Sequence, residues 1–185
     1  LLSMEVLRLD SQRIYDMYLA SRQTALLTVA VRLGVFQLLD ATPMSADQLR
    51  AQLQISERGA DALIVGLQAL QLIEQTPLGY RATEEASRFL VPGRTGYLGA
   101  LIDLEMNQFL TPERLYESMI SGKPGVYDTS SGDDAWDKHQ QDPEKARAFT
   151  LGMHSISEVP AGALAAVFDA SSHHISIHTA HCIRG

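Results

Sequence analysis

Histidines and a cysteine gather near the end of the chain: His173, His174, His178, His181 and Cys182. In a helix, the spacings of four and three residues would put three imidazoles on one face, and imidazole nitrogens are common zinc ligands. The intervening Ile175-Ser176-Ile177 favours strand or coil instead, and no acidic residue lies nearby to orient the rings. We therefore predict no metal site; His174, His178 and His181 are the residues that would form one.

Two groups of carboxylates could serve acid-base chemistry. Asp103 and Glu105 lie on one predicted helix, and Asp133, Asp134 and Asp137 lie in a loop rich in Gly, Ser and Asp. No other polar group converges on either set in the sequence. A solvated surface is the better interpretation of both, and we predict no catalytic residue in this chain.

Composition excludes several classes of partner. The net charge is -7, which disfavours nucleic acid and anionic membranes because both require a basic face. No apolar run approaches the roughly 20 residues of a membrane span, and no secretory signal pattern opens the chain. A single cysteine allows no intrachain disulfide. We expect a cytoplasmic protein with no nucleic-acid or membrane partner.

The elements that must position any site begin with two predicted helices. Apolar residues at helical spacing predict one helix between Met4 and Tyr18 and a second from about Arg22 to Leu39. The second is apolar around much of its circumference. A helix of that kind is buried on more than one side, often in a subunit interface.

A compact pattern then predicts a winged helix-turn-helix unit. Two short helices carry Ser45 and Ser56 as N-caps, and a small hairpin and a third short helix ending near Leu90 follow. The helix that would enter DNA has one basic residue, Arg58, beside Glu57 and Asp61, so we favour a structural role. The expected ranges are 46–53, 57–72, 73–76, 80–83 and 83–90.

The remainder also looks helical. Further helices are predicted over 97–109, 112–121 and from Asp142 onward, with Pro160 interrupting the last and a final helix over 161–168. The fold class is therefore mainly α, with a winged helix-turn-helix, a small hairpin and extra dimerisation helices. These helices carry more apolar surface than one such chain covers, which predicts an intertwined homodimer.

Several motifs resemble a known family. Residues 24–36 (TALLTVAVRLGVF) are similar to the "AL..A..LGIF" helix of class I O-methyltransferases, the group of plant phenylpropanoid, bacterial polyketide and hydroxyindole methyltransferases. The winged-helix segment resembles theirs at 45–49, 67–73 and 80–83. Further likenesses lie at 115–124 (LYESMISGKP), Trp136, 149–153 (FTLGM) and 168–171 (FDAS).

The resemblance implies the N-terminal dimerisation and substrate-capping domain of an S-adenosylmethionine-dependent enzyme. Such an enzyme methylates an aromatic or polyketide-like hydroxyl, so an aromatic small molecule is the expected ligand. By the same resemblance, the substrate-lining candidates are Phe109, Trp136, Phe149, Met153 and His154. The spacing of Phe149 and Met153 suits an ordinary core pair equally well, and His154 is more easily read as an incidental helix-end histidine than as a base.

The departure from the family concerns the cofactor. A strand and a glycine-rich loop should follow the linker helix, since that loop lets the backbone approach the methyl donor. The residues after Ser171 show neither. We therefore expect a truncated chain that holds no cofactor and is inactive by itself. The expected parts are dimerisation helices (1–40), a winged-helix unit (41–92), dimerisation and linker helices (93–170) and a divergent tail (171–185).

Two alternatives remain open at this point. One is a winged-helix transcription regulator, which a basic patch on the wing would support. The other is a free-standing helical dimer that binds a hydrophobic small molecule.

Overall fold

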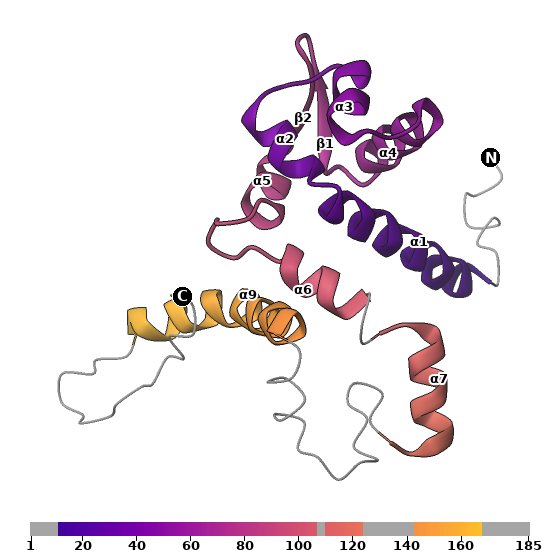
Figure 1. The fold of residues 1–185 in the computed structure, drawn as a ribbon, viewed down its shortest axis with the longest axis vertical. Coiled ribbons are helices and arrows are strands. Elements are labelled where there is room, and N and C mark those ends of the chain that lie inside the picture. The colour runs from indigo at the N-terminus through magenta and orange to yellow at the C-terminus, as the bar shows by residue number, and fades with distance from the viewer. Residues whose placement is uncertain (1–10, 107–109, 124–142, 168–185) are drawn as a thin grey trace, which may run out of the picture.

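The computed structural model describes residues 11–106, 110–123 and 143–167, and these are mostly helical with one two-stranded antiparallel sheet, which confirms the predicted fold class (Figure 1). The elements, in chain order, are α1 (Gln12–Arg32), α2 (Val35–Ala41), α3 (Ala46–Leu53), α4 (Glu57–Ala69), β1 (Ile73–Thr76), β2 (Gly79–Ala82), α5 (Glu84–Leu90), α6 (Gly99–Leu104), α7 (Pro112–Ser121) and α9 (Pro143–Val167).

Side-chain caps fix the starts of the short helices. Ser45 and Gln48 form a reciprocal capping box at α3, and the hydroxyl of Ser56 accepts from the backbone N–H of Gly59 at α4. Thr83 caps α5 in the same way and also donates to the carbonyl of Leu72 at 3.3 Å. The predicted positions of α3, α4, the hairpin and α5 are confirmed because these local signals decide where each helix begins.

The N-terminal helices differ from the prediction. A single helix, α1, runs without a break through residues 18–22, where the sequence suggested a boundary, since no Gly or Pro interrupts that stretch and the hydroxyl of Ser21 donates to the carbonyl of Tyr18 within the helix. The predicted helix over 22–39 is instead divided at Gly34, whose φ of 72° lies in the left-handed region that glycine adopts at little cost. The chain turns there and α2 begins.

Two predicted helix boundaries later in the chain were also wrong. Pro160 lies inside α9 instead of interrupting it. Proline loses one helical hydrogen bond, but Ile156, whose carbonyl would have received it, is exposed, so water can replace the missing donor. Helix α6 starts at Gly99 and not at Tyr97, because the backbone N–H of Tyr97 closes a turn onto the carbonyl of Arg94.

One core joins the N-terminal helices to the winged-helix unit. Val35, Phe36 and Leu39 of α2 are buried together with Leu49 of α3 and Leu67 of α4. Helices α2 and α5 also pack on each other, and α2 packs on β2. Side chains on both sides of the expected boundary at residue 40 therefore share one apolar interior, although the four expected parts remain predictions.

Helices α6 and α9 form a second packed pair below the winged-helix unit (Figure 1). Gly152 of α9 lies against Leu104 of α6, and a Cβ at position 152 would come within 2.8 Å of Cδ2 of that leucine. The glycine therefore permits close approach of the two helices. An ion pair between Arg32 and Asp103, at 3.4 Å, links α6 to the end of α1.

No single helix among the described residues is long and apolar enough to cross a membrane. Helices α1 and α2 taken together have the length and composition of a membrane span, but they form a bent pair. Helix α2 contributes Phe36 and Leu39 to the core.

Candidate functional site

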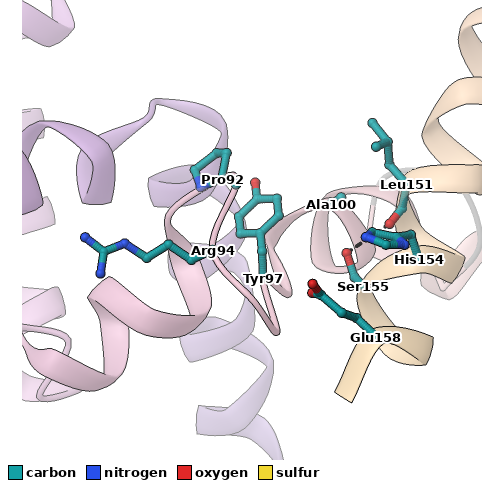
Figure 2. Close-up of a pocket in the computed structure, with 9 residues that line it drawn as sticks. Pro92, Arg94, Tyr97, Ala100, Leu151, His154, Ser155 and Glu158 are labelled. Atoms are coloured by element: carbon teal, nitrogen blue, oxygen red, sulfur yellow. Dashed lines mark hydrogen bonds between the residues drawn. The ribbon is translucent and has the colours of Figure 1, made fainter. Parts of the chain in front are cut away.

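A pocket of about 460 Å³ lies between the segment that follows α5, the start of α6 and the middle of α9. Figure 2 shows the ring of Tyr97 on one side of it, with His154, Ser155 and Glu158 opposite on α9. Arg94 and several apolar groups make up the rest of its wall. The lining residues are Pro92, Gly93, Arg94, Tyr97, Ala100, Leu151, His154, Ser155 and Glu158.

Two long-range contacts hold the segment that carries this pocket. The guanidinium of Arg94 pairs with the carboxylate of Asp40 in α2 at 2.6 Å, and in Figure 2 its side chain extends away from α9. The backbone N–H of Gly96 donates to Oε2 of Glu158 at 2.8 Å. The segment is thus tied to the winged-helix core at one point and to α9 at the other.

The polar groups of the pocket differ in what they can still bind. The hydroxyl of Ser155 donates to the carbonyl of Leu151 at 2.9 Å, so its proton is already used. Burial raises the pKa of Tyr97 above 10.0, and the nearby carboxylate of Asp103 raises it further. The phenol is therefore a neutral hydrogen-bonding group at physiological pH. Glu158 keeps Oε1 free of any hydrogen bond to another described residue.

The structure separates residues that the sequence grouped together. His154 lines the pocket, whereas Phe149 and Met153 do not. At about 100° per residue, His154 lies about 100° from Met153 and about 140° from Phe149 around α9, and Glu158 lies farther still from both, so the two pairs face different sides of the helix. Both are half-buried. The other candidates lie outside the described residues: Phe109, Trp136, His174, His178 and His181.

Sequence reasoning missed Arg94, Tyr97 and Glu158 as pocket residues. The available signal was the pair Gly93 and Gly96 around Arg94, since both glycines have positive φ, 82° and 84°, and mark a folded loop. Nothing local in the sequence could pair that loop with Asp40 or Glu158. Among the described residues, no three His, Cys, Asp or Glu side chains gather in a way that would hold a metal ion.

A second surface feature is apolar. It consists of apolar residues on two separate helices, α1 and α7, each at least 47% exposed, and we call this set the α1/α7 face. Helix α7 has no buried residue although it is strongly amphipathic. The members are Ile14, Tyr15, Met17, Tyr18 and Leu19 of α1 with Leu115, Tyr116, Met119 and Ile120 of α7.

Comparison with known proteins identifies the first part of the chain. The profile of the O-methyltransferase dimerisation domain matches residues 15–92. N,N-dimethyltransferase OxyT of Streptomyces rimosus is 29% identical over 165 residues, which cover 89% of this chain and 48% of OxyT. The 3-hydroxy-5-methyl-1-naphthoate 3-O-methyltransferase of Streptomyces sahachiroi is 29% identical, over 80% of this chain and 42% of that enzyme.

Solved structures agree on the fold. The pyocyanin biosynthetic protein PhzM superposes with a TM-score of 0.72 at 22% identity, over 86% of this chain and 48% of PhzM. Human N-acetylserotonin methyltransferase, in complex with SAM, superposes with a TM-score of 0.71 at 17% identity, over 90% of this chain and 51% of that one.

The chain spans about half the length of the curated relatives that it matches. A dimerisation domain implies a homodimer, and the relatives are small-molecule methyltransferases by name. Residues 15–92 of this chain thus match the O-methyltransferase dimerisation domain.

Proposed function

We propose that this chain is the dimerisation and substrate-capping part of an S-adenosylmethionine-dependent methyltransferase that acts on the hydroxyl of an aromatic or polyketide-like molecule. Its relatives support this assignment, because one of them is named for methylation of a naphthoate hydroxyl. The match of residues 15–92 to the dimerisation domain supports the role in assembly.

The observation that carries the proposal is the exposure of the α1/α7 face. Met17 is 63% exposed on α1, and Met119 is 75% exposed on α7. Burying one such side chain contributes about 1.5–3 kcal/mol, and soluble monomers rarely leave many of them together in water. We assign this face to the interface of the homodimer.

Charge reversal of the apolar surface tests that assignment. The double variant Ile14→Glu/Met17→Glu places two carboxylates in the proposed interface and should convert the dimer to a monomer in sedimentation equilibrium. Gln23→Glu is the matched control, because it adds a carboxylate at an exposed polar position of the same helix. A double variant that stays dimeric at the concentrations at which the control is dimeric would rule out α1 as the interface.

The acceptor is proposed to contact Phe149 and Met153, on the side of α9 away from the pocket described above. Flat aromatic molecules pack well against a phenyl ring and a thioether. In a methyltransferase that contains this chain together with a donor-binding domain, Phe149→Leu and Met153→Leu should each raise KM for a naphthol acceptor and leave KM for S-adenosylmethionine unchanged. Equal changes in both constants, or none in either, would contradict the assignment.

The methyl donor is proposed to bind outside these 185 residues, since their sequence contains no glycine-rich motif of the kind that lets a backbone approach this cofactor. Titration calorimetry of the chain with S-adenosylmethionine should show no saturable heat. A micromolar site would overturn this part of the proposal.

The regulator hypothesis receives no support from the recognition helix. On α4 the basic residue Arg58 is exposed beside Glu57 and Asp61, which are also exposed. The backbone phosphates of DNA would therefore face two carboxylates and one guanidinium, which is an unfavourable balance of charge for binding.

A further inference from the structure

We propose that the pocket between residues 92–97 and α9 is a second small-molecule site, distinct from the acceptor contacts at Phe149 and Met153, and that it takes an aromatic ligand carrying a protonated amine. Its volume of about 460 Å³ falls within the usual range of ligand pockets, about 300–1,000 Å³.

The walls fit an aromatic ring. Pro92, Ala100 and Leu151 supply apolar surface, and the ring of Tyr97 lies across from α9 (Figure 2). Stacking on Tyr97 would place the ligand between an aromatic face and the helix. A tyrosine face also attracts a cation within about 6 Å of its centroid.

The charges of the lining favour a cation over an anion. Arg94 is already paired with Asp40, at 2.6 Å, so its charge is offset within the protein. Glu158 is the carboxylate of the lining, and its Oε2 accepts from the neutral N–H of Gly96. That bond leaves the negative charge of the carboxylate and an Oε1 with no hydrogen bond to another described residue, and Oε1 can accept from an ammonium group in a charge-assisted hydrogen bond.

The rim of the pocket is held in place before any ligand binds. The Arg94–Asp40 pair and the Gly96–Glu158 hydrogen bond hold the loop at two points. The backbone N–H of Leu98 also donates to the carbonyl of Phe89 at 2.8 Å. A preorganised site loses less conformational entropy on binding, which raises affinity for a small ligand.

The test uses three ligands of one shape: 1-naphthylmethylamine, 1-naphthalenemethanol and 1-naphthoate. They are titrated into the 15N-labelled chain at pH 8, where histidines are ordinarily neutral, and the amide signal of Gly96 is followed. For twelve heavy atoms we expect a Kd of roughly 0.1–1 mM for the amine. The alcohol should bind about fivefold more weakly and the carboxylate at least about tenfold more weakly.

Variants separate this site from general binding. Glu158→Gln keeps an oxygen for Gly96 but removes the charge, so it should bring the affinities of amine and alcohol within about twofold of each other. Glu144→Gln is the matched control, an exposed carboxylate on the same helix that does not line the pocket, and it should keep the wild-type preference. Ala100→Met should fill the cavity and abolish the shift at Gly96, with circular dichroism confirming that the variant is folded.

Equal affinities for the three ligands, no saturable shift at Gly96, or a preference that survives Glu158→Gln would each overturn the proposal. Shifts confined to Phe149 and Met153 would also overturn it while leaving the acceptor assignment intact. An amine preference at Gly96 combined with no effect of Phe149→Leu or Met153→Leu on the acceptor KM would do the reverse.

Discussion

The backbone N–H of Gly96 lies 2.8 Å from Oε2 of Glu158, and this bond joins positions that are 62 residues apart. Gly96 adopts a φ of +84°, and a Cβ there would come within 3.2 Å of Cγ2 of Val159 and 3.3 Å of Cε1 of Phe89. Glycine is thus required at this position for its backbone conformation and for space.

These two requirements can be measured separately. Gly93→Ala tests the backbone conformation alone, because φ at Gly93 is +82° but nothing lies within 4 Å of the added methyl group. We expect it to lower the free energy of unfolding by about 1–2 kcal/mol. Gly96→Ala should lower it by about 1–3 kcal/mol more, since the neighbours must also move. Equal effects in urea titrations would show that packing at Gly96 is unimportant.

Two glycines of α9 should respond to alanine with opposite signs. Gly162 has open space around it, so Gly162→Ala should stabilise the protein by about 0.5–1 kcal/mol through helix propensity. Gly152 faces Leu104, which is 2% exposed and has little room to shift. Gly152→Ala should therefore destabilise by about 1–3 kcal/mol. Thermal unfolding measures both, and a stabilising Gly152→Ala would contradict the close approach of α6 and α9.

Thr83 joins the turn between α4 and β1 to the start of α5. Its hydroxyl donates to the carbonyls of Gln71 and Leu72, at 3.2 and 3.3 Å, and accepts from the N–H of Ala86 at 3.4 Å. Thr83→Ala should cost about 1–2 kcal/mol. Thr83→Ser keeps the hydroxyl and should cost much less, and a serine variant as unstable as the alanine variant would argue against the cap.

Alkaline pH tests the environment of Tyr97. Its pKa is raised by burial first and by Asp103 second, so folding favours the neutral phenol. The stabilising contribution is complete below the unfolded pKa, about 10, and is lost as pH rises through the higher folded pKa. Tyr97→Phe should therefore flatten the fall of the urea midpoint above pH 10. Tyr116→Phe, at an exposed position, is the control and should follow the wild type.

Local signals explain which parts of the fold the sequence predicts. Ser45 with Gln48, Ser56 and Thr83 each cap a helix through contacts only three residues long, so their pattern is visible in the chain. Gly34 was harder, because the same residue fits a helix interior or a turn, and packing of Val35 and Phe36 into the core decides between them.

The site is less visible because its contacts are distant in sequence. Arg94 finds Asp40 across 54 residues and Gly96 finds Glu158 across 62. Neither hydrophobic periodicity nor the spacing of residue types in a sequence indicates contacts between such distant positions. His154 was singled out from the sequence as a companion of Phe149 and Met153, but the turn of α9 directs it to the other side.

The mass of the chain in solution is the most direct test of its assignment as a dimerisation domain. Sedimentation equilibrium at tens of micromolar should give twice the chain mass of 20.3 kDa, because the α1/α7 face needs a partner to cover it. A species of 20.3 kDa at those concentrations would contradict the account and would leave that apolar face without an explanation.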